Sequence, residues 1–126
     1  MQEKTRVLTG RVISAIPVVA MLFSAAGKLT GSPQMIAVMV GTLGFMQETL
    51  LLIAFLEITC VVLYAFPRTA VLGAVLMTGY LGGAIVAHVR VSDNVNLLAP
   101  LGLGILAWIG LYLRDGRVRA LLPLRS

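Results

Sequence analysis

Four long apolar runs occupy most of this sequence, and short basic or turn-forming segments separate them. The chain is 59% hydrophobic and 12% charged over 126 residues, whereas soluble domains are typically about 45–50% apolar and about 25% charged. A helix of about 20 apolar residues crosses the hydrocarbon core of a bilayer, which is roughly 30 Å thick. The sequence therefore predicts an all-α integral membrane protein in which residues 1–126 form a single transmembrane domain.

The predicted architecture is a membrane four-helix bundle, with approximate spans at 12–29, 48–66, 68–89 and 97–113. The first run resembles the core of a signal peptide, but it continues to Leu29 without a polar cleavage region, so we expect it to remain as a span. The segment from Pro33 to about Phe45 is apolar but too short to span beside its neighbours. We expect it to form a short interfacial or re-entrant helix between spans one and two.

The basic residues are distributed unevenly across this four-span arrangement. Of the ten lysine and arginine residues, all except Lys28 and Arg90 fall on the side of the two termini. Because positive charge concentrates on the cytoplasmic side, both termini are predicted to be cytoplasmic. The net charge of +5 lies in short flanks rather than on one folded face, which indicates anionic lipid headgroups as partners and no nucleic acid.

Small residues recur at a spacing of four in the third predicted span. Gly79 and Gly83 form a GxxxG pair, and Ala87 extends the same stripe. Lipid is as apolar as leucine, so membrane helices associate largely through close backbone approach at small residues. We expect these three residues to pack helix against helix.

Glu57 is the residue most indicative of function, because it lies inside an apolar run. It follows Glu48 by nine positions, which places it about 13 Å deeper along a helix and near the middle of the bilayer. A carboxylate at that depth is costly unless it is protonated, paired or facing a hydrated cavity. The alternative is a purely structural hydrogen bond across helices, to Thr59 or Thr78 for example. Glu48 is half a turn out of phase with Glu57, so we expect it at headgroup level.

Lys28 and His88 lie on the outer side of the same arrangement and complete the candidate site with Glu57. The lysine ends span one, where its ammonium can reach a carboxylate. The chain has one histidine and one cysteine, which is a poor basis for a metal site, so we expect none. A proton-relay or hydrogen-bonding role suits a neutral imidazole at this position. Lys28, Glu57 and His88 are therefore the predicted ligand-binding or proton-relay residues.

Three stretches of the sequence resemble the DoxX family of small four-span bacterial and archaeal membrane proteins. They are FSAAGKL at 23–29, FLEITCVVLYAFPRTAVLGAVLMTGYLGGAIVAHVR at 55–90, and LAWIGLYLRDGRVRALLPLR at 106–125. The lysine, glutamate and histidine of the family pattern fall on Lys28, Glu57 and His88. The resemblance implies a multi-pass protein of a bacterial or archaeal cytoplasmic membrane.

The family resemblance also implies a role beside redox proteins, because some relatives are membrane subunits of systems that pass electrons to quinone. This chain has no pair of haem-ligating histidines, cysteine cluster or flavin motif, so we expect no cofactor of its own. The leading hypothesis is an accessory subunit that binds a quinone or another small apolar molecule. Redox proteins and further copies of the chain are the expected protein partners.

Two other interpretations stay open. One is a membrane enzyme in which Glu57 and His88 act as an acid–base pair on a lipid-soluble substrate. Helical rise separates the two residues by on the order of 10 Å along the membrane normal, so tilt or a break would have to bring them together. The other is a structural assembly partner that uses the glycine stripe as a contact face.

Overall fold

The computed structural model describes residues 2–92 and 95–122. The third stretch that resembles the DoxX family, at 106–125, therefore ends outside the described residues. Within these ranges the chain forms helices and no strand, which confirms the predicted all-α fold class. The elements are α1 (Glu3–Thr30), α2 (Pro33–Ile36), the π-helix η1 (Ala37–Thr42), α3 (Thr49–Ala65), α4 (Ala70–Arg90), α5 (Leu98–Arg114) and α6 (Gly116–Leu121).

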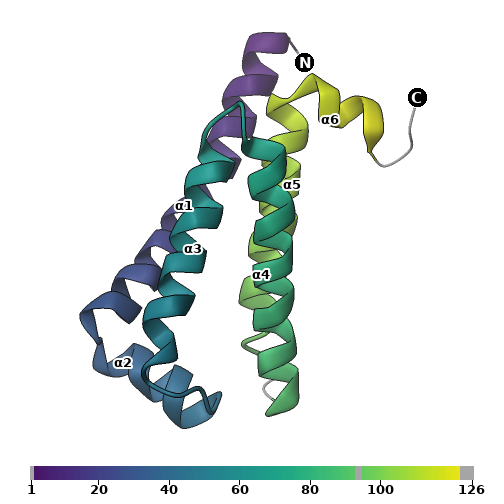
Figure 1. The fold of residues 1–126 in the computed structure, drawn as a ribbon. Coiled ribbons are helices and arrows are strands. Elements are labelled where there is room, and N and C mark those ends of the chain that lie inside the picture. The colour runs from purple at the N-terminus through teal and green to yellow at the C-terminus, as the bar shows by residue number, and fades with distance from the viewer. Residues whose placement is uncertain (1, 93–94, 123–126) are drawn as a thin grey trace.

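Helices α1, α3, α4 and α5 are the long elements, and they run side by side (Figure 1). Each coincides with one of the four predicted spans. Helices α1 and α4 are long and apolar enough to cross a membrane, and α3 and α5 are apolar helices of 17 residues, at the lower end of the length range for a span. Helix α1 begins at Glu3 rather than near residue 12, because its basic first turns continue the helix beyond the apolar run.

The predicted short helix between spans one and two is present as α2 followed by η1. It begins at Pro33, whose missing N–H and fixed φ suit a first helical position. The helix then widens, and the Leu43 amide bonds to the Val38 carbonyl five residues earlier at 2.8 Å. Gly44 follows with a φ of +79°, which glycine adopts without the steric cost that other residues have. The segment thus turns sharply before α3.

The four long helices are packed most tightly at the end that carries α6 and the start of α1. There α1 crosses α5 so closely that a Cβ on Gly10 would lie 2.8 Å from the Gly110 carbonyl oxygen. Tyr64 of α3 is fully buried beside them and donates hydrogen bonds to the Ala107 carbonyl at 2.6 Å and the Ser14 hydroxyl at 3.0 Å. This tyrosine joins three helices at the closed end of the bundle.

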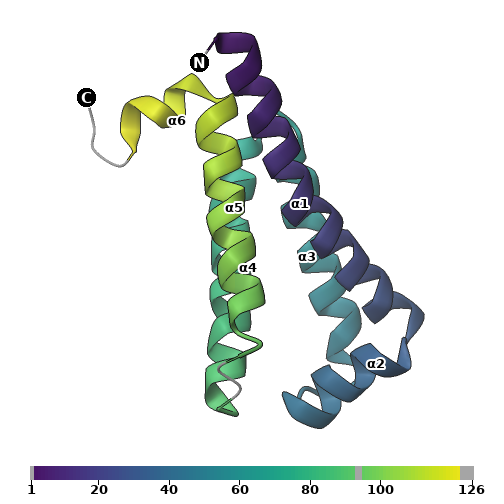
Figure 2. The same cartoon turned by 180° about the vertical axis from the view of Figure 1, so that it is seen from behind.

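At the opposite end the pair α1–α3 diverges from the pair α4–α5 (Figures 1 and 2). The η1 segment packs across this end, where Met39 and Leu43 form a second apolar cluster with Leu50 and Ala87. Arg90 donates a hydrogen bond to the Leu43 carbonyl, which ties the end of α4 to the segment after η1. A cavity lined by all four long helices lies between this cluster and the closed end of the bundle.

Candidate functional site

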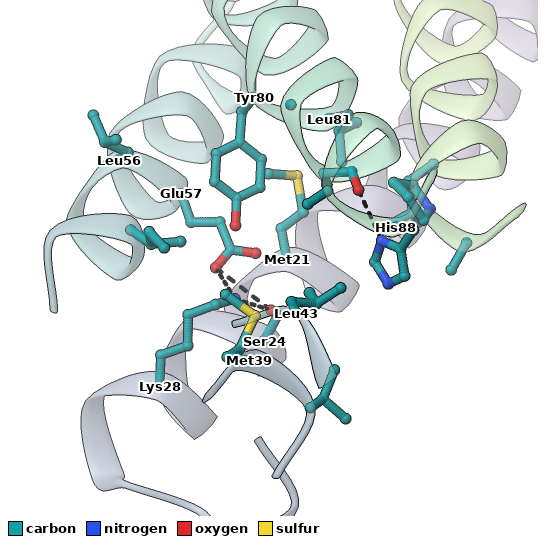
Figure 3. Close-up of a pocket in the computed structure, with 18 of the residues that line it drawn as sticks. Met21, Ser24, Lys28, Met39, Leu43, Leu56, Glu57, Tyr80, Leu81 and His88 are labelled. Atoms are coloured by element: carbon teal, nitrogen blue, oxygen red, sulfur yellow. Dashed lines mark hydrogen bonds and ion pairs between the residues drawn. The ribbon is translucent and has the colours of Figure 1, made fainter. Parts of the chain in front are cut away.

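A cavity of about 590 Å³ lies between the diverging helices (Figure 3). All four long helices and the α2–η1 segment contribute to its wall, which is mostly apolar and includes the methionines Met21, Met35 and Met39. Methionine side chains are flexible and polarisable, so they adapt to ligands of different shape. Ligand sites in proteins typically measure roughly 300–1,000 Å³ and combine an apolar wall with a few polar groups.

Lys28 and Glu57 form a buried ion pair on this wall. The lysine Nζ lies 2.9 Å from Glu57 Oε1, and each side chain is 3% exposed. An unpaired charge that is so deeply buried in an apolar wall would be costly, and the pairing reduces that cost. Of the three states that the sequence allowed for Glu57, the structure therefore shows the paired one.

Ser24 and Tyr80 complete the polar cluster around the ion pair. Lys28 donates to the Ser24 hydroxyl at 2.6 Å, and that hydroxyl donates to Glu57 Oε1 at 3.4 Å. The Tyr80 hydroxyl points toward the Glu57 carboxylate, and the two side chains interact electrostatically (Figure 3). Both hydrogen bonds from α1 reach Oε1, and the other carboxylate oxygen is turned away from Lys28, toward the side of Tyr80 and Met21 (Figure 3).

His88 lines the same cavity from α4 but lies well apart from the ion pair (Figure 3). Its Nδ1 is 2.7 Å from the Ala84 carbonyl oxygen of the preceding turn. A carbonyl oxygen can only accept, so Nδ1 carries a proton, and in the neutral ring Nε2 is the acceptor. The structure thus brings Lys28 and Glu57 into contact and places His88 separately on the cavity wall.

Gly79 and Gly83, for which we predicted a packing role, make no close helix contact within the described part of the chain. Both line the cavity and are exposed, and within the described chain no neighbouring atom lies within 4 Å of a Cβ built on either. The close helix contacts use other glycines, such as Gly73 against the Tyr64 backbone. Ala87 is buried in the second apolar cluster, as a packing residue would be.

The remaining polar candidates lie outside the cluster. Glu48 is exposed, consistent with its half-turn offset from Glu57. Thr59 donates to the Phe55 carbonyl, whereas Thr78 donates to the Ala74 carbonyl and accepts from Trp108 at 2.7 Å. The threonines are therefore occupied elsewhere, and Glu57 bonds to α1.

Sequence reasoning missed Ser24 and Tyr80 as members of the site. Ser24 precedes Lys28 by four residues, a spacing that places both on one face of α1. This signal was available once Lys28 had been selected. Tyr80 carries a hydroxyl within an apolar span, and such a group generally has a polar partner. Which helix supplies that partner depends on the packing.

The comparisons with known proteins give one family match. The sequence profile described as the DoxX-like family matches residues 12–110, a range that covers most of the chain and contains Lys28, Glu57 and His88. Among curated proteins and among solved structures, no match is found. The match to the family profile spans all four long helices except the outer turns of α1 and α5. This chain therefore belongs to the DoxX-like family.

Proposed function

We propose that this protein is an accessory subunit of a redox-linked membrane system and that its cavity binds a small apolar molecule such as a quinone. One observation carries the proposal. A mostly apolar cavity of about 590 Å³ has a buried Lys28–Glu57 ion pair on its wall. Such a wall favours a molecule with an apolar body and a small polar head.

The polar cluster suits a head group that carries carbonyl oxygens. A lysine ammonium has three donor protons, and the contacts with Ser24 and Glu57 use two of them. The third proton is available as a donor to a carbonyl oxygen of the ligand, and the Tyr80 hydroxyl, which interacts with the Glu57 carboxylate, can turn to donate to such an oxygen instead. His88 lines the cavity at a distance from this cluster, where it can contact a second polar group of the same molecule.

The proposed setting is a cytoplasmic membrane of a bacterium or archaeon, crossed by α1, α3, α4 and α5. The family is membrane-associated, and α1 and α4 have the length and apolarity of spans. Arg68 in the turn between α3 and α4, and the basic residues of α6, lie at the end of the bundle where α1 begins (Figure 1). On the positive-inside rule, we propose that this end is cytoplasmic. Redox proteins and further copies of the chain are the proposed protein partners.

A binding role has more support than acid–base catalysis by Glu57 and His88. Two groups that act on one atom must each come within about 3 Å of it. Figure 3 instead places the two side chains well apart, with Glu57 bonded to Lys28 and His88 bonded to its own helix. An assembly role through the Gly79–Gly83 stripe has less support, because these glycines line the cavity.

The test is native mass spectrometry with lipid extraction on the protein in nanodiscs, followed by titration with a quinone. We expect a co-purifying apolar molecule and saturable quinone binding. Tyr80→Phe retains the ion pair and should weaken binding about 10-fold, which corresponds to one lost hydrogen bond of about 1.4 kcal/mol. Glu57→Gln should weaken it further.

Glu48→Gln is the matched control, because Glu48 is an exposed glutamate of the same region, and its variant should bind as the unaltered protein does. Circular dichroism and size-exclusion chromatography establish that each variant folds. Equal quinone affinity in the unaltered protein and in folded Tyr80→Phe and Glu57→Gln variants would contradict the proposal.

A further inference from the structure

Several residues of α3 and α4 line the cavity and are also exposed, and we name this part of its wall the lateral mouth. Leu56 of α3 is 51% exposed and lines the cavity, and Gly79 and Gly83 of α4 are exposed and line it as well. Glu57 and Tyr80 are the chain neighbours of Leu56 and Gly79, so the mouth lies at the level of the polar cluster. With the four long helices in a bilayer, the surface at this level faces hydrocarbon.

Gly79 and Gly83 keep this mouth wide. They are four residues apart, so they lie on the same face of α4, and within the described chain a Cβ on either would have no neighbour within 4 Å. At the closed end of the same helix, a Cβ on Gly73 would overlap the Tyr64 backbone. One helix thus uses glycine in two ways, for close packing at Gly73 and for open space at Gly79 and Gly83.

Packing obstructs the route into the cavity from the end that carries η1. The η1 segment lies across this end, with Met39 and Leu43 buried against Leu50 and Ala87. Arg90 holds the Leu43 carbonyl in this position. The opposite end is closed by the packing of Tyr64 and the Gly10–Gly110 crossing. Compared with the two ends of the bundle, the lateral mouth is therefore the more open path to the polar cluster.

We propose that the cavity receives its ligand sideways from the hydrocarbon core and that a hydrocarbon chain of the bound molecule lies in the mouth over Gly79 and Gly83. This inference rests on the proposed function for the identity of the head group, and it assigns the ligand class as an amphiphile with a ring head and a long apolar tail. The head contacts Lys28 and Tyr80, while the tail remains in contact with the bilayer. The open space over the two glycines limits how wide a hydrocarbon chain the cavity can bind.

The first experiment tests the mouth without any quinone. Trp108 is the single tryptophan, so Trp108→Phe with Met39→Trp places one fluorophore on the buried cavity wall. In nanodiscs made with lipids brominated on their acyl chains, we expect the fluorophore to be quenched, because chains enter the mouth. Adding Gly79→Leu and Gly83→Leu should reduce quenching at least about 3-fold. Leu103→Trp, on the α5 wall, repeats the measurement if Met39→Trp does not fold.

Gly82→Leu is the matched control. Gly82 adjoins Gly83 on α4, also has no neighbour within 4 Å of a Cβ within the described chain, and lies outside the wall of the cavity. Its variant should be quenched as strongly as the parent. An unquenched parent, or equal quenching with and without the two leucines, would overturn the lateral mouth.

The second experiment compares a quinone with a ten-carbon tail and the same ring without a tail. The Gly79→Leu, Gly83→Leu variant should lose about 10-fold or more in affinity for the tailed quinone and stay within about 2-fold for the ring alone. An equal loss for both molecules, or no loss for either, would overturn the assigned tail position. If the unaltered protein binds neither quinone, the proposed head group is wrong, while the quenching experiment still decides whether hydrocarbon chains enter the mouth.

Discussion

Lys28 Nζ and Glu57 Oε1 lie 2.9 Å apart, on α1 and α3, and the two side chains are almost completely buried. The contact joins residues 29 positions apart in the chain on the wall of a cavity. Removing one partner of a buried ion pair leaves the other charge buried without a partner. Replacing both partners with apolar groups removes both charges and, with them, the desolvation cost of the pair. The two kinds of substitution should therefore differ sharply in their effect on stability.

The first prediction follows from this contact. We expect Lys28→Met and Glu57→Leu each to lower the free energy of unfolding by about 3–5 kcal/mol, because each leaves an uncompensated buried charge. The double variant should lose less than either single variant. Unfolding in detergent micelles with increasing SDS measures all three, and Glu48→Leu serves as the exposed control. Additive losses in the double variant would contradict coupling between the two charges.

The second prediction separates the two uses of glycine in the bundle. A Cβ on Gly110 would lie 2.9 Å from the Ser14 backbone nitrogen, whereas within the described chain a Cβ on Gly79 meets nothing within 4 Å. Gly110→Ala should therefore destabilise the protein by about 1–3 kcal/mol through overpacking. Gly79→Ala should be neutral or stabilise it by up to about 1 kcal/mol, because alanine favours the helix. Similar unfolding midpoints for the two variants would show that the α1–α5 crossing is not tight.

The third prediction concerns pH and the start of α6. Partial burial acts to raise the pKa of Asp115, but hydrogen bonds from Arg117 outweigh this effect and lower the pKa below its ordinary value. A carboxylate with a lowered folded-state pKa contributes stability that is present above the unfolded-state value, about 3.9, and that is lost as the pH falls through the folded-state value.

Helix α6 should therefore exchange its amide hydrogens faster when the pH falls below about 4, after correction for the intrinsic exchange rate at each pH. The cap is the Asp115 Oδ1 that accepts from the Arg117 amide at 3.0 Å. Asp115→Asn can also cap the helix but does not titrate, so its α6 should show no such pH step. An identical step in both proteins would assign it to another group.

The fourth prediction concerns the contact between Arg90 and the Leu43 carbonyl. Hydrogen bonds to charged groups contribute about 1.5–3 kcal/mol, and this one holds the segment after η1. Arg90→Gln should increase hydrogen exchange in residues 39–45 and leave the closed end around Tyr64 unchanged. Arg11→Gln, which removes an exposed arginine of α1, should alter neither region. Uniformly faster exchange in Arg90→Gln would indicate a global loss of stability instead.

The fold was predictable to the extent that it follows from the lengths of the apolar runs and the positions of proline and charge. Pro33 marks the start of α2, and the four long helices fall on the four predicted spans. The widened turn of η1 was not predictable, because the choice between hydrogen bonds to the fourth and fifth preceding carbonyl depends on tertiary packing.

The site was predictable where a residue type is unusual in its surroundings. Lys28 and Glu57 could be selected because charges in apolar runs are costly, but their pairing required knowledge that α1 contacts α3. A GxxxG motif indicates that a second helix could approach the two glycines closely. It does not indicate whether a helix lies there. Within the described part of the chain, the tight crossing forms at Gly10 and Gly110, whereas Gly79 and Gly83 have no such close neighbour, and their packing role stays a prediction.

The Lys28–Glu57 pair also sets the charge preference of the cavity. The two opposite charges cancel, so the polar cluster presents a strong local dipole without net charge. An ionic solute entering this low-dielectric space would lose its hydration and find no compensating charge, whereas a neutral molecule gains directed hydrogen bonds at little desolvation cost. The residues that make the cavity polar thus favour neutral ligands over ions. The affinity for a neutral ligand should change little with ionic strength.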